Sequence, residues 1–328
     1  MRPSPRVTII LATYNQQAFV REAMESALAQ TYPRIEIIVD DNGSTDGTAA
    51  ILSEYAGRSN VSLTLHDENE SPPKRLNEAI ARSTGELISI LYGDDMYRPN
   101  KIERQVEAFR RLPSDHGVVY GPVHRINVIT GDRWLAYRGG PSGSVLPELL
   151  RRYVGRWPVS PISPLTRREC FLRYPCHEAI VAEGEAIFLF FALSFRFQYI
   201  DEPFAVMREH EENAGKQYLR NFRSSLQLLD AVEREPEFPH ELRPLVRATR
   251  AARYRAVAWL LLRLANDPVS GRDLLVRSVQ LRPRSLVHPR TLAGAALSLL
   301  PSPALRHVNA VLNKARRHRE NLVFRHED

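Results

Sequence analysis

The sequence predicts an α/β protein with a largely parallel sheet, followed by an α-helical C-terminal region. Short apolar runs alternate with segments of helical periodicity through the N-terminal third of the chain. Two of these runs end in paired aspartates, Asp40–Asp41 and Asp94–Asp95, which suit the carboxyl edge of an open sheet and not a core. Beyond residue 236 the chain returns to helical periodicity, interrupted by prolines.

Five apolar, mostly β-branched runs are expected to form strands, and they span residues 7–11, 35–39, 61–65, 87–91 and 117–120. The intervening helices are expected at residues 18–30, 46–55, 73–81 and 99–111. Strands and helices that alternate at this spacing form parallel pairs with right-handed crossovers. Residues 121–182 are rich in Pro, Gly and aromatic side chains, which fits either an insertion over an active site or a plain surface excursion.

The charge balance divides the chain into two parts. Residues 1–214 hold 24 Lys and Arg against 28 Asp and Glu, whereas residues 215–328 hold 21 against 10. This break predicts a catalytic domain over residues 1–214 and a basic helical domain over residues 215–328. A strongly apolar helix is expected late in the first domain, at residues 186–195. The helices of the second domain are expected at residues 242–264, 271–281, 292–300 and 304–319.

Composition excludes several classes of protein. An apolar content of 43% and a charged content of 25% are typical of a globular protein. The N-terminal apolar run has the length of a strand and not of a signal peptide, and no run is long enough to span a membrane. Cys170 and Cys176 match no zinc or redox motif, which favours a reducing compartment. We therefore expect a cytoplasmic protein.

The paired aspartates indicate nucleotide-sugar chemistry. Asp41 can accept an N–H from a nucleobase, although an Asx-turn with Asp46 as a helix cap is the alternative interpretation. The Asp94–Asp95 pair follows a glycine. Its carboxylate oxygens suit Mn²⁺ or Mg²⁺ when a diphosphate supplies further ligands, and the alternative is a surface turn.

Several motifs in one order resemble the start of family 2 glycosyltransferases. They are Val7–Asn15, Ser26–Pro33, Val39–Gly47, Asn77–Glu86 and Gly93–Pro99. The resemblance is close over residues 6–110 and loose over residues 111–214. It implies a GT-A fold, the Rossmann-like mixed sheet of nucleotide-diphospho-sugar transferases, and it says nothing about the substrate.

By position, the resemblance implies roles for the residues at the two acidic strand ends. Thr13, Tyr14 and Asp41 would line the nucleobase site. Asp94 would face the ribose and diphosphate, and Asp95 would coordinate the divalent metal, Mn²⁺ or Mg²⁺.

Other candidates rest on segments that depart from the family pattern or match it loosely. The family's acidic base corresponds here to Glu185, with Glu183 as the fallback, where many relatives carry aspartate. The arginine of the loop before Asn77 is displaced, so that either Arg75 or Lys74 reaches the diphosphate. Tyr92 replaces the first aspartate of the usual Asp-Xaa-Asp-Asp run. A later segment resembles the family's Arg-Xaa-His-Xaa-Xaa-Asn pattern, and its histidine, His210, either contacts the diphosphate or metal or lies on the surface.

These parts imply an inverting mechanism. The base takes a proton from an acceptor hydroxyl while that oxygen attacks the anomeric carbon in line, and the metal neutralises the departing nucleoside diphosphate. The expected activity is transfer from a UDP-, dTDP- or GDP-sugar in polysaccharide, glycolipid or natural-product synthesis. Two alternatives remain. One is a sugar-phosphate nucleotidyltransferase, although residues 12–17 lack its glycine-rich loop. The other is a catalytically degenerate nucleotide-sugar binding protein.

The basic C-terminal domain has three interpretations. Arg282, Arg284 and Arg290 beside residues 292–300 suit peripheral contact with the inner face of a membrane that carries lipid-linked acceptors. The helices could instead form a homo-oligomer interface, or a solvated helical cap. No nucleic acid partner is expected, because no recognised binding motif accompanies the charge.

Overall fold

The computed structural model describes residues 4–155, 157–180, 187–211, 213 and 218–323. By internal contacts the chain divides into two compact units, Met1–Phe238 and Pro239–Asp328. Helix α8 (Tyr218–Arg234) therefore groups with the first unit, although it follows the change in charge balance after residue 214. The domain limits drawn from composition stay a prediction.

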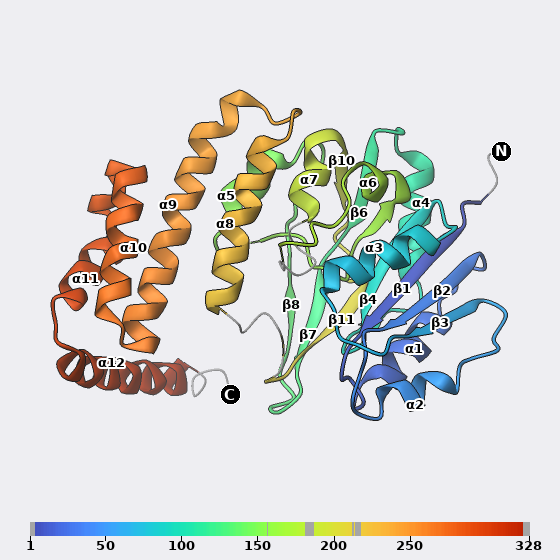
Figure 1. Ribbon diagram of the computed structural model, residues 1–328, viewed down its shortest axis with the longest axis horizontal. Coiled ribbons are helices and arrows are strands. Elements are labelled where there is room, and N and C mark those ends of the chain that lie inside the picture. Colours follow the sequence, from blue (N-terminus) through green and yellow to red (C-terminus); the bar gives the residue numbers. More distant parts are fainter. Residues whose placement is uncertain (1–3, 156, 181–186, 212, 214–217, 324–328) are drawn as a thin grey trace. The chain divides into compact units, whose positions relative to one another are not determined.

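Within the described residues, the main sheet of the first unit has seven strands in the order β10-β6-β9-β4-β1-β2-β3 (Figure 1). They are β1 (Val7–Thr13), β2 (Ile35–Asp41), β3 (Val61–Leu65), β4 (Leu87–Tyr92), β6 (His116–Tyr120), β9 (Leu165–Arg167) and β10 (Arg196–Tyr199). Strands β3, β2, β1 and β4 are parallel, and β9 runs antiparallel between β4 and β6. The mixed α/β sheet predicted from the sequence is confirmed.

The helices of the first unit include the five expected from the sequence, together with α5, α6 and α8, which were not predicted. They are α1 (Val20–Leu28), α2 (Thr48–Ser53), α3 (Pro72–Arg82), α4 (Lys101–Arg111), α5 (Leu146–Arg152), α6 (Arg168–Arg173), α7 (Ile187–Ser194) and α8. In α4 the buried Ile102, Val106 and Phe109 recur at helical spacing and form its inward face. Helix α3 begins with proline at its first positions, where the missing N–H costs no hydrogen bond.

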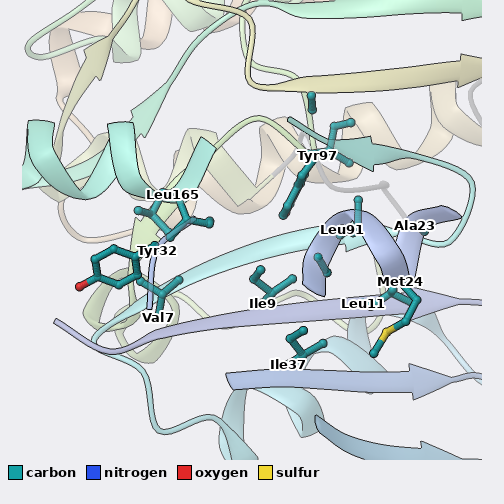
Figure 2. Close-up of a cluster of buried hydrophobic side chains, with 14 of the residues drawn as sticks. Val7, Ile9, Leu11, Ala23, Met24, Tyr32, Ile37, Leu91, Tyr97 and Leu165 are labelled. Carbon is teal, nitrogen blue, oxygen red and sulfur yellow. The ribbon is translucent and has the colours of Figure 1, made fainter. Parts of the chain in front are cut away.

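The core lies where α1 covers the centre of the main sheet (Figure 2). Ile9 and Leu11 of β1 and Leu91 of β4 are fully buried, and Ala23 and Met24 of α1 pack in the same cluster. Because β1 is buried on both faces, its sequence is a continuous apolar run and not an alternating one. Each large side chain buried in this way contributes about 1.5–3 kcal/mol to the stability of the sheet.

A second sheet of four strands was not predicted from the sequence. Among the described residues its order is β5-β11-β7-β8, and its strands are β5 (Met96–Tyr97), β7 (Val123–Asn127), β8 (Arg133–Ala136) and β11 (Ala205–Glu209). Strand β11 pairs antiparallel with β5, which directly follows Asp94–Asp95. This pairing brings a distant segment of the chain to the second acidic strand end.

The second unit is helical, as predicted. Its helices are α9 (Arg243–Leu260), α10 (Pro268–Leu281), α11 (Pro289–Ser298) and α12 (Ser302–Val323). Helix α10 packs between α9 and α11 (Figure 1), and a small apolar cluster of Ala258, Leu262, Leu275 and Leu305 holds the unit together. In the part of the chain that is described, no helix is long and apolar enough to cross a bilayer.

Candidate active site

The acidic strand ends meet at one edge of the main sheet. Strand β1 lies between β2 and β4 and is parallel to both, so their carboxyl ends point the same way. The register pairs Thr13 with Asp41 and Ala12 with Tyr92, which leaves Asp94 and Asp95 just beyond the edge. In an open α/β sheet this edge is where ligands bind.

Asp41 is buried, yet only small polar groups compensate its charge. Its carboxylate accepts hydrogen bonds from the backbone N–H (3.1 Å) and the hydroxyl of Ser44. Burial raises the pKa of Asp41, and the Ser44 hydrogen bonds oppose this shift only in part. Such a carboxylate can accept an N–H from a base that fills the remaining space.

The neighbouring groups leave a polar position beside Asp41. Thr13 is buried, and its hydroxyl oxygen has no hydrogen-bond partner among the described residues. A Cβ on Gly93 would lie only 2.3 Å from that oxygen, so only glycine allows this close approach. Tyr14, the next residue of the predicted base site, is 40% exposed and free to contact a planar ligand.

Asp40 has a different environment, although it precedes Asp41 directly. It is buried, and its carboxylate forms ion pairs with Arg82 of α3 and with His66, whose Nε2 lies 3.1 Å from Oδ1. Its charge is therefore met within the protein. Asp40 anchors α3 and the end of β3 to β2.

Asp95 is the most deeply buried carboxylate of this edge, with 3% of its surface exposed. Its Oδ1 accepts the backbone N–H of Arg208 at 2.8 Å. Burial, and then the negative charge of Asp94, raise the pKa of Asp95 well above its usual range. Asp94 itself lies against His210, whose Nε2 is 3.1 Å from Oδ2, and against the amide of Asn213 at 3.4 Å. The second pair thus concentrates negative charge with little compensation.

Arg208 holds this arrangement together, and the sequence assigned it no role. Its guanidinium donates to the main-chain oxygen of Asp94 (2.9 Å) and to the carboxylate of Glu22 in α1. It also lies over the ring of Phe19 at 5.1 Å, and that ring lies 5.2 Å from the ring of His210. The Arg-Xaa-His spacing was the signal that could have identified it, because residues two apart in an extended segment share one face.

Arg75 reaches the first acidic strand end, but carboxylates already surround it. Its Nε donates to Asn42 at 3.2 Å, and its other nitrogens pair with Glu70 (2.9 Å) and Glu78 (3.0 Å). Lys74 pairs with Glu70 as well, at 2.7 Å. A diphosphate contact by either cation therefore competes with these carboxylates and stays a prediction.

A divalent cation fits the second acidic pair if a ligand shares its coordination. Among the described residues, no three His, Cys, Asp or Glu side chains converge as a metal site. Asp95 nevertheless offers a buried carboxylate, with Asp94 and His210 beside it. The backbone N–H of Arg208 and the charges of Arg208 and Arg125 offset its charge only in part. Oxygen ligands of this kind suit Mg²⁺ and Mn²⁺, and a diphosphate supplies the missing ones.

The predicted bases, Glu185 and Glu183, lie outside the described residues. Helix α7 begins at Ile187, directly after them, and its apolar side chains are buried. A role for either glutamate therefore stays a prediction.

Comparison with known proteins identifies the family. The sequence matches the profile described as Glycosyl transferase family 2 over residues 8–193, more than half of the chain. The chain belongs to glycosyltransferase family 2. The matched region contains both acidic pairs and ends within α7, whereas His210 and the whole second unit lie beyond it.

Curated relatives match the N-terminal part of this family 2 chain. An uncharacterised glycosyltransferase of Rickettsia typhi is 42% identical over 117 residues, which are 36% of this chain and 36% of that protein. A glycosyltransferase of Nostoc sp. is 28% identical over 218 residues, 63% of this chain and 66% of that protein. The match spans between 17% and 36% of the length of four Rickettsia relatives.

Solved structures show the same fold at low sequence identity. TarS 1–349 of S. aureus, in complex with UDP-GlcNAc, has a TM-score of 0.62 at 16% identity and covers 94% of this chain and 92% of that chain. The mannosyltransferase PcManGT of Pyrobaculum calidifontis, in complex with GDP-Man and Mn²⁺, has a TM-score of 0.57 at 18% identity, with coverages of 94% and 84%. The expected GT-A fold is thereby confirmed.

Proposed function

We propose that this protein is a metal-dependent inverting glycosyltransferase that moves a sugar from a nucleoside-diphosphate donor to an acceptor hydroxyl. The observation that carries the proposal is the shared carboxyl edge of β2, β1 and β4. It combines a buried, weakly compensated Asp41 with the concentrated negative charge of Asp94 and Asp95. A base-recognising carboxylate and a cation-binding pair on one edge suit the two ends of a nucleoside diphosphate.

The residues of this edge bind and orient the donor. Asp41 accepts an N–H from the base, beside the unpartnered hydroxyl of Thr13 and the exposed ring of Tyr14. Asp95, with Asp94 and His210, would hold a divalent cation, which when bound supplies positive charge against the leaving diphosphate. The donor complexes of the structural neighbours, with UDP-GlcNAc and with GDP-Man and Mn²⁺, support this assignment.

Glu185 acts as the general base in this proposal. A carboxylate there takes the acceptor's proton while the hydroxyl oxygen attacks the anomeric carbon, and a single displacement inverts the configuration. Replacing Glu185 with Gln is expected to lower the transfer rate by roughly 10²–10⁴-fold while donor binding stays intact. Glu183→Gln is the matched variant. Loss of activity in that variant alone would move the base to Glu183.

The chemical class of the acceptor is the most specific part of the proposal. A hydroxyl of a polysaccharide, a glycolipid or a natural product fits the mechanism equally well, and UDP, dTDP and GDP are the candidate nucleotides. The pairing of the GT-A fold with an attached basic helical unit favours a lipid-linked acceptor among these.

The proposal is tested by thermal unfolding of the full chain with UDP, dTDP, GDP and CDP, each with and without Mn²⁺. We expect one nucleotide to stabilise the protein strongly only together with Mn²⁺, because the residues that the structure describes offer too few metal ligands by themselves. Saturation at about 100 times the Kd corresponds to about 2.7 kcal/mol of stabilisation. Mn²⁺ without nucleotide is the control and should shift the unfolding temperature little. Failure of all four nucleotides would contradict the proposal.

A further inference from the structure

Helix α11 packs small residues against the second unit and leaves two leucines exposed. Thr291, Gly294 and Ser298 are buried, whereas Leu292 is 56% exposed and Leu299, at the C-terminal end of the helix, is 75% exposed. A Cβ on Gly294 would lie 3.0 Å from a methyl group of Leu275, so the small residues allow α11 to lie close against α10. Leu297 is partly buried and packs against the core of the second unit, whereas Leu292 and Leu299 are exposed.

The exposed apolar side chains continue before α11. Leu286 and Val287, in the short helix η4 (Pro283–Val287), are 56% and 75% exposed. Leu292 and Leu299 are seven residues apart and so lie on one face of α11, together with exposed alanines. We call Leu286, Val287, Leu292 and Leu299 the α11 apolar segment. Exposed apolar groups at this density in one short segment indicate a binding surface.

The charge around this segment has one sign. Between Asp273 and Glu320 the sequence holds nine Lys and Arg and no Asp or Glu. Arg282, Arg284 and Arg290 are exposed at the N-terminal end of α11. Within the described ranges, neither these three nor the half-buried Arg255 forms an ion pair. Burial, and then the charges of Arg282 and Arg290, lower the pKa of Arg255, so these cations repel one another.

These features select one kind of partner. A second copy of this surface would place arginines against arginines without a carboxylate between them, which is unfavourable. A nucleic acid would meet the arginines but would leave the leucines and valine in water. A bilayer that contains anionic lipids satisfies both, because its phosphates lie directly above its hydrocarbon region.

We propose that the second unit docks on an anionic lipid surface through the α11 apolar segment, with Arg282, Arg284 and Arg290 at the lipid phosphates. The apolar side chains would enter the boundary between headgroups and acyl chains while α11 lies in the plane of the surface. Docking of this kind goes beyond the proposed transfer reaction, because it needs neither donor nor acceptor.

Vesicle flotation of the full chain tests the proposal. The protein is mixed with vesicles of phosphatidylcholine alone, or of phosphatidylcholine with phosphatidylglycerol, at low and at physiological salt. Two double variants remove each contribution, Leu292→Ser with Leu299→Ser and Arg284→Gln with Arg290→Gln. The matched controls are Leu172→Ser, an exposed leucine of α6, and Arg111→Gln, an exposed arginine of α4. Because the substituted sites are exposed, we expect every variant to fold, and circular dichroism verifies this.

We expect binding to the anionic vesicles and not to the neutral ones. The leucine variant should weaken binding roughly tenfold or more, and the arginine variant roughly fivefold for each arginine removed, whereas both controls bind like the wild type. Three results would overturn the proposal. They are no flotation with anionic vesicles at low salt, flotation that the leucine variant does not reduce, and a dimer in light scattering that the leucine variant dissociates.

Discussion

The two aspartate pairs at the sheet edge look alike in sequence, but the fold compensates their charges differently. In the first pair, Asp40 forms ion pairs with Arg82 and His66, and Asp41 accepts hydrogen bonds from Ser44. One carboxylate is thus neutralised within the protein, and the other is kept weakly compensated. The first pair combines a structural residue with a binding residue.

In the second pair, neither carboxylate contacts a guanidinium in the described part of the chain. Among the described residues, the guanidinium of Arg208 goes to Glu22 and to the main-chain oxygen of Asp94, while Asp95 receives only a backbone N–H. The Asp94 carboxylate there contacts His210 Nε2 at 3.1 Å and the amide of Asn213 at 3.4 Å. We infer that a carboxylate pair whose charge the fold leaves uncompensated serves to bind a charged ligand. In a pair with an internal counter-ion, one of the two carboxylates has a structural role.

The largest expected effect comes from replacing Asp95 with Asn. The amide oxygen can still accept the N–H of Arg208, but the buried charge is gone, so turnover should fall on the order of a thousandfold. In the absence of nucleotide, the free energy of unfolding should rise, because the repulsion between adjacent carboxylates is removed. Turnover assays and urea unfolding measure the two effects. Asp67→Asn, an exposed aspartate after β3, is the control, and wild-type turnover in Asp95→Asn would refute the comparison.

Replacing Asp40 with Asn should act on stability instead. Arg82 and His66 lose the carboxylate that pairs them, and breaking a buried pair costs about 3–5 kcal/mol. The side chain of Arg82 is 38% exposed, so hydration of its guanidinium offsets part of this energetic cost. We therefore expect the free energy of unfolding to fall by about 2–3 kcal/mol in urea unfolding. Nucleotide affinity should change little. If the Asp40→Asn protein is stable but no longer binds nucleotide, Asp40 is the binding residue and Asp41 the structural one, contrary to our assignment.

The positions of the strand ends could be predicted from the sequence. The different roles of the two aspartates within each pair could not. Strands β1, β2 and β4 are buried on both faces and leave uninterrupted apolar runs, so their ends and the aspartates after them are visible in the sequence. However, no sequence pattern distinguishes the role of one aspartate from that of its immediate neighbour. Their partners come from α3, from the end of β3 and from β11.

The second sheet escaped prediction for a related reason. Strand β5 has two residues, too few for a periodic pattern, and its partner β11 lies far along the chain, so that the contact between Asp95 and Arg208 joins residues 113 apart. Nothing local marks such a pairing. The same limit applies to the α11 apolar segment, where the sequence suggested a membrane contact but could not show which side chains face outward.

The binding half of the first pair is tested by Asp41→Asn. An amide retains one acceptor but removes the charge, so nucleotide affinity should fall roughly ten- to thirtyfold, as expected for one charge-assisted hydrogen bond. Stability should be unchanged or slightly higher, because burial raises the pKa of Asp41 and its ionised form is therefore unfavourable in the fold. Calorimetric titration with the nucleotide found by thermal unfolding measures this. Destabilisation equal to that of Asp40→Asn would remove the distinction within the pair.

The smallest effect concerns Lys101, a fully buried lysine at the start of α4 that follows the second pair in the chain. Its Nζ donates to the Ser89 hydroxyl at 2.7 Å and to Gln105 Oε1 at 3.0 Å, and it lies 4.2 Å from the centre of the Tyr97 ring. No carboxylate contacts it in the described structure, and burial lowers its pKa well below the usual range. The buried site therefore favours the neutral amine of Lys101 over the ammonium, and no described contact makes Lys101 a counter-ion for the second pair.

The pH dependence of stability gives the measurement. The unfolded chain binds a proton at Lys101 that the folded protein does not, in the window between the lowered pKa and about 10.4. Stability should therefore rise with pH across this window, by up to about 1.4 kcal/mol per pH unit from this residue. Lys101→Met removes that contribution, so wild type should gain stability relative to the variant in urea unfolding as the pH increases toward about 10. Lys74→Met, at a partly exposed site, is the control. Parallel curves of stability against pH for wild type and Lys101→Met would mean that Lys101 is charged in the folded protein. Its positive charge would then compensate part of the negative charge of the second pair.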